Sequence, residues 1–307
     1  MYRLGVLSPI FVRPPTGGPD SRRDTFLELT LQDLRDRGYI EPKSLMVEHR
    51  SAKGHVERLP ELAAELVRLH VDVILAEAAP AIHAALTATT TIPIVMITGD
   101  DPVRSGFVAS LGRPGGNITG VTILARDLAV KRLEFLKMAV PGASRIAVLG
   151  NFASQTSAEQ LGEVKTAAGS LRVQLLVVEA RGASQLDGAF TAIAKERPEA
   201  LLVFTDPVFY LYRQRIGDFA RERHLPMISD WKETAEAGAL IAYGPSFPSL
   251  AEQVATFIDR ILKGTRPADL PVEQPTQFPL VVNMKVAKSL GLVIPPSLLT
   301  RADPVIE

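Results

Sequence analysis

The sequence contains no cysteine, no excess of either charge and no long apolar run. Without cysteine there are no disulfides, thiolate zinc sites, iron–sulfur clusters or cysteine nucleophiles. Lys and Arg number 34 against 34 Asp and Glu, and a chain of zero net charge lacks the basic field that nucleic acid binding needs. No segment approaches the ~20 consecutive apolar residues of a membrane-spanning helix. We therefore expect no nucleic acid partner.

The motifs of catalysis and nucleotide binding are also missing. There is no glycine-rich dinucleotide fingerprint, no P-loop and no G-x-S-x-G elbow. The five histidines are scattered without metal-ligand spacing. Asp100 and Asp101 are adjacent, and neighbouring side chains in an extended loop point apart. We expect no metal, no cofactor and no enzymatic activity.

What the sequence does contain is a regular alternation of secondary structure. Its 307 residues suggest two domains at ~150 residues each. Short aliphatic runs predict strands at 3–8, 45–49, 71–75, 92–97, 145–149, 173–178, 200–205, 225–229 and 240–243. Segments of helical period lie between most of them, which predicts α/β lobes whose parallel sheets carry helices on both faces.

Helix boundaries can be expected from local signals. A helix is expected over 21–37, because Ser21 and Asp24 resemble a capping box and Gly38 suits the position after the last turn. A second is expected over 157–170. Pro80 is expected at the first position of a helix, where its missing N–H costs nothing.

The two halves of the sequence echo each other. The strand 3–7 resembles 145–149, the strand 71–75 resembles 199–203, and 92–95 resembles 225–228, in the same order. This order predicts two similar lobes, although strands of α/β proteins resemble one another in general.

In open parallel sheets, ligands bind beyond the carboxyl ends of the strands. The residues expected at such ends are Ser8, Phe11, Ala78, Ala79, Pro80 and Asp101 in the first half, and Asn151, Phe152, Ser154, Ser157, Asp206, Phe209, Asp230 and Trp231 in the second. Carboxylates among them can pair with a ligand ammonium, and the aromatic rings can flank an apolar group. An Asp-Pro pair is also typical of a helix N-cap, and one Asp can fill both roles.

Several segments, taken in order, resemble the tryptophan/tyrosine-type substrate-binding proteins of ABC importers. The segments are 3–8, 58–67, 90–95, 99–103, 113–120, 238–244, 260–264 and 290–296. The resemblance implies the type I periplasmic binding protein fold, in which two Rossmann-like lobes are joined by a multi-strand hinge. The lobes would comprise residues 1–120 plus about 245–275 and residues 121–244 plus about 276–307, with the ligand cleft between them.

The resemblance also implies a function. A periplasmic monomer would capture a small solute by hinge closure and deliver it to the membrane permease of an ABC importer. An export signal would then have been removed before this sequence was recorded. An effector-sensing domain of the same fold and a two-lobed enzyme remain alternatives.

Two departures from the family pattern concern the solute. Amino acid-binding members carry Thr-Pro where this chain has Ala79-Pro80, and Asp-Asn where it has Asp206-Pro207. The loss of a hydroxyl and an amide weakens the case for a free α-amino acid. Nearby aromatic residues favour an aromatic or partly apolar acid, so the expected solute is amino acid-like or an aromatic acid.

Overall fold

The computed structural model describes residues 1–11 and 25–307. The chain folds into two compact units: unit 1 is Met1–Leu124 with Phe247–Thr276, and unit 2 is Ala125–Ser246 with Gln277–Glu307. The chain thus passes between the units three times, at 124/125, 246/247 and 276/277. Among the described residues, no helix is both long and apolar enough to cross a membrane.

Unit 1 is built on a parallel sheet. Its strands are β1 (Tyr2–Ser8), β2 (Leu45–Ser51), β3 (Val73–Glu77), β4 (Ile94–Thr98) and β5 (Ile118–Thr122). They lie in the order β2-β1-β3-β4-β5, and every pairing is parallel. Because the central strands are buried on both faces, they read as continuous aliphatic runs rather than alternating ones.

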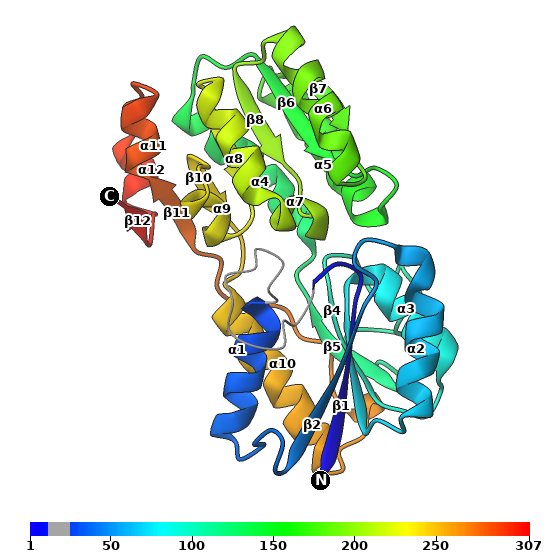
Figure 1. Ribbon diagram of the computed structural model, residues 1–307. Coiled ribbons are helices and arrows are strands. Elements are labelled where there is room, and N and C mark those ends of the chain that lie inside the picture. Colours follow the sequence, from blue (N-terminus) through cyan, green and yellow to red (C-terminus); the bar gives the residue numbers. More distant parts are fainter. Residues whose placement is uncertain (12–24) are drawn as a thin grey trace. The chain divides into compact units, whose positions relative to one another are not determined.

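Helices cover both faces of this sheet (Figure 1). The helical elements are α1 (Thr25–Asp36), η1 (Val56–Arg58), α2 (Leu59–Arg68), α3 (Ala78–Ala88), α10 (Phe247–Leu262) and η2 (Pro267–Asp269). Helices α2 and α3 lie on one face, and α1 and α10 lie together on the other (Figure 1). The α/β class expected from the alternating pattern is confirmed.

The end of α1 agrees with the sequence, which placed Gly38 after the last turn of this helix. Gly38 has φ of +95°, and the N–H groups of Gly38 and Tyr39 donate to the carbonyls of Arg35 and Leu34. These two bonds form the Schellman ending expected there. Ser21 and Asp24 lie outside the described residues.

Pro80 was expected to open its helix, and this expectation was wrong. Helix α3 begins two residues earlier, at Ala78, directly after β3. Proline is tolerated at the third position because the first four N–H groups of a helix have no acceptor within it.

Gly120 in β5 lies where the backbones of β5 and β4 approach too closely for a side chain. It has φ of +138°, and a Cβ atom there would lie 2.1 Å from the carbonyl oxygen of Met96 on β4. We expect Gly120→Ala to lower the free energy of unfolding by about 2 kcal/mol or more. Gly116→Ala is the matched control, because a Cβ there would meet nothing within 4 Å. Denaturant titration of both variants tests this, and equal stabilities would contradict it.

Unit 2 contains a larger sheet. Its strands are β6 (Arg145–Gly150), β7 (Gln174–Glu179), β8 (Ala200–Val203), β9 (Met227–Ser229), β10 (Ile241–Tyr243), β11 (Leu280–Asn283) and β12 (Val305–Ile306). They lie in the order β12-β11-β10-β9-β8-β6-β7, and the pairing of β10 with β11 is the antiparallel one.

Alternate residues of the unit 2 strands supply two separate cores. Ile146 and Val148 of β6 pack with residues of α4 and α5, whereas Ala147 and Leu149 pack with residues of α6 and α8. The helices are α4 (Ala125–Ala139), α5 (Gln155–Ser170), α6 (Ala183–Glu196), α7 (Pro207–Leu211), α8 (Arg213–Glu222), α9 (Lys232–Glu236), α11 (Met284–Ser289) and α12 (Pro296–Leu299). The sheet therefore has helices on both faces, as expected.

The two sheets repeat one strand order. In unit 1 the order is β2-β1-β3-β4, and in unit 2 it is β7-β6-β8-β9. The matched strands β1 and β6, β3 and β8, and β4 and β9 are those whose sequences echo each other. The first strand of each unit, β1 in unit 1 and β6 in unit 2, has the second strand on one side and the third strand on the other. The order of the strands reverses there, so the loop after β1 or β6 lies at a topological switch point.

Candidate functional site

Three of four neighbouring strands in unit 2 are followed by polar side chains at their carboxyl ends. Strands β6, β8, β9 and β10 are adjacent in the sheet, and β6, β8 and β9 are followed by Asn151, Asp206 and Asp230. Both aspartates are buried. Because parallel strands end at one edge, these side chains are held at the same edge of the sheet.

Asp206 caps a helix and is also a buried carboxylate. It is the N-cap of α7, since Oδ1 accepts the N–H of Val208 at 2.8 Å, and Pro207 follows at the first helical position. The capping role expected of Asp-Pro is thus confirmed. Only 6% of Asp206 is exposed, and desolvation by burial raises its pKa to about 6 despite the hydrogen bonds that stabilise the carboxylate.

Asn151 supplies an amide to Asp206. Its Nδ2 donates to Oδ2 of Asp206 at 3.1 Å, so an amide lies beside this aspartate although Pro207 follows it in sequence. The Oδ1 atom of Asn151 is buried and has no hydrogen-bond partner among the described residues. A buried acceptor without a donor is costly, and such groups often mark a site that a ligand or water completes.

Arg132 of α4 is the charged partner of Asp230. Both side chains are buried, and the positive charge of Arg132 works against the desolvation that raises the pKa of Asp230. The carboxylate also accepts from Ser229 Oγ and from the Trp231 N–H, each at 3.0 Å. A hydrogen bond from the Thr205 side chain completes its surroundings.

The guanidinium of Arg132 connects three strand ends. Its Nη1 donates to Thr205 Oγ1 at 2.9 Å after β8, and its Nε donates to the carbonyl of Tyr243 at 2.8 Å on β10. Its Nη2 has no hydrogen-bond partner among the described residues. Gly244 lies beside it, where a Cβ would be 2.5 Å from the Asp230 carbonyl.

Sequence reasoning missed Arg132, although a signal was present. In α4, Arg132 occupies the buried face formed by Leu128, Ala129, Leu133 and Leu136. A charged residue in the apolar stripe of a helix indicates a buried ion pair.

Helix α5 fixes the loop after β8. The side chain of Gln160 accepts from the Thr205 N–H at 3.2 Å and donates to the Thr205 carbonyl at 3.3 Å. Thr205 was expected in the strand, but β8 ends at Val203. The backbone N–H and carbonyl of Thr205 bond to the side chain of Gln160 instead of to the backbone of a neighbouring strand. Ser157, one turn earlier on α5, is fully buried, and its Oγ has no hydrogen-bond partner among the described residues.

Aromatic rings lie next to these polar groups. Phe152 and Phe204 meet edge to face with ring centroids 6.2 Å apart. A side chain on Gly150 would lie 2.5 Å from the Phe152 ring, so the glycine allows this close approach. Tyr210 and Trp231 form a second edge-to-face pair at 6.5 Å.

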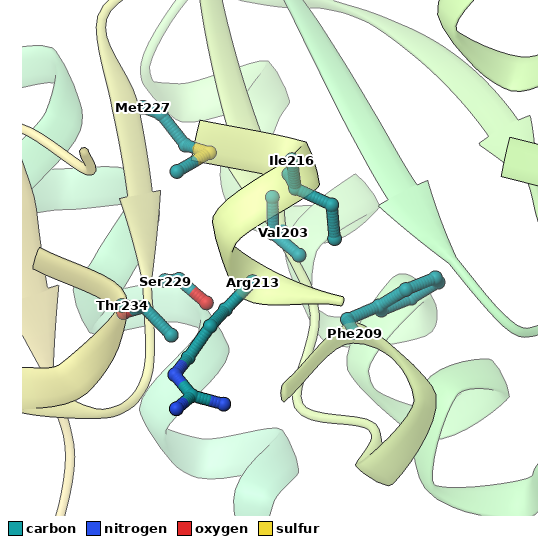
Figure 2. A pocket seen from close by; sticks show the side chains of 7 residues that line it. All are labelled: Val203, Phe209, Arg213, Ile216, Met227, Ser229 and Thr234. Carbon is teal, nitrogen blue, oxygen red and sulfur yellow. The ribbon is translucent and has the colours of Figure 1, made fainter. Parts of the chain in front are cut away.

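A small hollow with a cavity volume of about 10 Å³ lies beside β8 and β9. Its lining residues are Val203, Phe209, Arg213, Ile216, Met227, Ser229 and Thr234, and Figure 2 shows the Arg213 side chain extending between Thr234 and Phe209. Arg213 also stacks on the Tyr210 ring, 4.4 Å from its centroid. The hollow is smaller than the ~300–1,000 Å³ typical of ligand pockets, so it does not hold an amino acid-sized solute by itself.

The unit 1 candidates lie at the ends of neighbouring strands. Ser8 ends β1 and is fully buried, and its Oγ accepts the N–H of Phe11 at 3.1 Å. Ala78, Ala79 and Pro80 open α3 directly after β3, and Ala78 has a left-handed φ of +62°. Such a backbone is unusual for alanine and makes a sharp turn from strand to helix.

Asp101 is engaged with its own loop. Its Oδ1 accepts the N–H groups of Val103 and Arg104 at 3.0 and 3.2 Å. Asp100 is buried, with its carbonyl accepting from Thr122 Oγ1 at 2.7 Å. Within residues 1–11 and 25–307 there is no cluster of three or more His, Asp or Glu side chains arranged to hold a metal.

Similarity to known proteins is consistent with this architecture. A tyrosine-binding protein from Clostridioides difficile (strain R20291) is 26% identical over 263 residues, 85% of this chain and 75% of that protein. A conserved domain protein from Vibrio cholerae has a TM-score of 0.88 at 25% identity, covering 100% of this chain and 99% of that one. The ABC domain in complex with L-Trp from Streptococcus pneumonia has a TM-score of 0.87 at 24% identity, covering 99% of both chains.

The model of the family described as ABC transporter substrate binding protein matches residues 22–306. This match covers nearly the whole chain and confirms the resemblance inferred from the sequence, and the structural neighbours confirm the periplasmic binding protein fold. The chain belongs to the ABC transporter substrate binding protein family.

Proposed function

We propose that this protein captures a small amino acid-like solute at the carboxyl ends of the unit 2 strands, with Asp206 contacting its amine. The observation that carries the proposal is the state of Asp206. Its carboxylate is buried, and its partners among the described residues are the Val208 N–H and the Asn151 amide, with no cation. Burying a carboxylate without a counter-charge is costly.

Charge counting at these strand ends supports a cationic group on the solute. Arg132 balances Asp230, so the negative charge of Asp206 is left over. A solute ammonium supplies both the missing charge and a donor for Asn151 Oδ1. A neutral polyol supplies donors but leaves the charge uncompensated.

An aromatic side chain on the solute is consistent with the nearby rings of Phe152, Phe209 and Trp231. A tyrosine-binding relative and a structural neighbour in complex with L-Trp support the same class. We propose that Ser154, Ser157 and Asp230 line the unit 2 part of the site. Ser8, Phe11, Ala78, Ala79, Pro80 and Asp101 are proposed to contribute from unit 1.

We propose that the protein delivers this solute to the membrane permease of an ABC importer, and its membership of the family supports this proposal. We propose that the protein works as a monomer in the periplasm and that solute binding shifts the population towards a closed form. The three passages of the chain between the units are suited to hinge bending. Binding, rather than turnover, is then the activity of the protein.

Calorimetric titration with L-tyrosine and L-tryptophan tests this proposal. We expect saturable binding at one solute per chain, and chromatography of the released solute should recover it chemically unchanged. Conversion of the solute, or binding of a sugar in preference to any amine-bearing compound, would contradict the proposal.

A further inference from the structure

We infer that the outer edge of β7 is a docking surface for a second copy of this chain, which pairs with it antiparallel about a two-fold axis at Leu176. The inference goes beyond solute binding and does not depend on it. It is carried by the position of β7 in its sheet, by its uncharged aliphatic interior and by the match of that sequence to its own antiparallel copy.

The sheets of the two units have four edge strands, and three of these edges are protected. In unit 1, β2 carries Glu48 and Arg50, which pair with each other. The other edge strand of unit 1, β5, is covered, because Gly120 and Thr122 share backbone hydrogen bonds with Glu273. In unit 2, the edge strand β12 is only two residues long. Charges, covering segments and short length are the usual means by which proteins prevent strands from pairing with other chains.

Strand β7, the remaining edge, has none of these protections. It is six residues long, and aliphatic side chains occupy all of 175–178. It pairs with β6 on one side, and no strand among the described residues pairs with it on the other. Val177 is 39% exposed, and Leu175 and Leu176 are partly buried. An apolar edge of this kind is suited to pairing with another chain.

The backbone of β7 presents alternate residues to this outer edge. The N–H groups of Gln174 and Ala180 donate to the carbonyls of Ser144 and Gly150 at 2.7 and 3.1 Å, so the even-numbered residues face β6. Successive residues of a strand point their N–H and C=O groups to opposite sides. The residues that face outwards are therefore the odd-numbered ones: Leu175, Val177 and Glu179.

The segment 173–179 matches its own antiparallel copy. Outward-facing residues pair only with each other, which places the two-fold axis at a residue, and the centre of the segment is Leu176. In this register Leu175 lies opposite Val177 of the second copy, and Leu176 lies opposite its own counterpart. Aliphatic side chains thus pack on aliphatic ones, an arrangement that stabilises paired strands.

The charges at the ends of β7 do not oppose this pairing. Arg172, which is exposed, precedes the strand. It meets the opposite end of the second copy, where Glu179 is balanced by Arg181. No two uncompensated charges of the same sign therefore face each other across the pair.

The length of the contact sets its strength. Residues 173–179 extend over about 24 Å of strand, and pairing over this length buries less than the about 1,200 Å² at the lower limit of stable interfaces. We therefore expect a transient dimer with a dissociation constant of about 0.1–1 mM. The single chain remains the form that is proposed to deliver the solute.

Sedimentation equilibrium of the solute-free full chain, from about 10 μM to about 1 mM, tests the pairing. We expect the average mass to rise reversibly from that of one chain towards that of two. Val177→Lys should weaken association about tenfold or more, because a lysine on an edge strand opposes pairing. Val293→Lys is the matched control, since Val293 is 90% exposed and lies outside β7.

Both variants should keep the melting temperature of the wild type, because both side chains are exposed. The mass of a single chain at every concentration would overturn the inference, as would equal association of Val177→Lys and Val293→Lys.

Disulfide trapping tests the register, because the chain has no cysteine of its own. Leu176→Cys places a thiol opposite its own counterpart at a Cα separation of about 4.5 Å, which suits a disulfide. Gln174→Cys is the matched control. Gln174 is more exposed than Leu176, but its counterpart lies about 14 Å away, since Gln174 pairs with Val178 of the second copy.

In a glutathione redox buffer at equal protein concentration, we expect about tenfold more crosslinked dimer for Leu176→Cys than for Gln174→Cys. Equal crosslinking of the two variants, or more of it in Gln174→Cys, would overturn the two-fold pairing at Leu176.

Discussion

Replacement of Arg132 by methionine is expected to lower the free energy of unfolding by about 3–5 kcal/mol. Methionine keeps much of the length of the side chain but removes the charge that opposes the desolvation of Asp230. It also removes the donors to Thr205 Oγ1 and the Tyr243 carbonyl. Asp230 is then left as a buried charge without a cation, a costlier arrangement than an apolar replacement of both partners.

Denaturant titration at neutral pH measures this loss, and Arg132→Met/Asp230→Asn is the decisive companion. The double variant should be more stable than Arg132→Met, because the uncompensated charge has been removed. Arg145→Met is the control, since that exposed arginine pairs with Glu196 at the surface, where an ion pair contributes ~1 kcal/mol or less. A loss in Arg132→Met no larger than in Arg145→Met would show that the buried pair does not hold the strand ends.

Binding of an amine-bearing solute is expected to weaken about tenfold for each pH unit below about 6. Burial raises the pKa of Asp206 to about 6, so the solute-free carboxyl is largely protonated at pH 5 and ionised at pH 7. An ammonium pairs with the ionised form, so at pH 5 binding must release close to one proton per solute. Asp206→Asn should bind weakly with little pH dependence, and Asp206→Ala should also bind weakly and stay folded.

The same pKa has an opposite effect on the stability of the solute-free protein. The folded-state pKa lies above the ordinary value of 3.8, so the folded protein binds the proton more tightly. The contribution of Asp206 is complete below about pH 3.8 and is lost as the pH rises through about 6, by about 3 kcal/mol in total. Burial raises the pKa of Asp230 in the same direction, and the charge of Asp230 also raises the pKa of Asp206. The difference between wild type and Asp206→Asn therefore reports Asp206 together with its coupling to Asp230.

Calorimetry with L-tryptophan or L-tyrosine in buffers of different ionisation enthalpy counts the released protons. Asp187→Asn is the control, because Asp187 is exposed and pairs with Arg215. Affinity that stays constant from pH 5 to 7 in the wild type would remove Asp206 from contact with the amine.

Much of the fold follows from periodicity and local signals. The strands expected from aliphatic runs are present, with ends shifted by one or two residues, and the echo between the halves corresponds to a shared strand order. The buried face of α1, formed by Phe26, Leu27, Thr30, Leu31 and Leu34, is the one that its spacing indicates. These features can be predicted because they depend on residues close in sequence or on the strand–helix pattern that both halves of the chain repeat.

The candidate site was predictable only in part. The rule for strand ends selects Asn151, Asp206 and Asp230 because each follows a strand. It misses Arg132, Thr205 and Gln160, because their roles depend on contacts between α4, α5 and loops distant in sequence. The pairing of Asn151 with Asp206 likewise joins residues 55 apart. Such contacts require knowledge of how the helices pack.

Mass spectrometry of the full chain after incubation with a metabolite extract tests the central claim most directly. The protein is sprayed under native conditions and then denatured, so that any bound molecule is first weighed and then identified. The account predicts a complex of one chain with one small molecule that contains both a basic amine and a carboxylate. A chain that retains no small molecule, or one that selects a compound without a basic nitrogen, would contradict it.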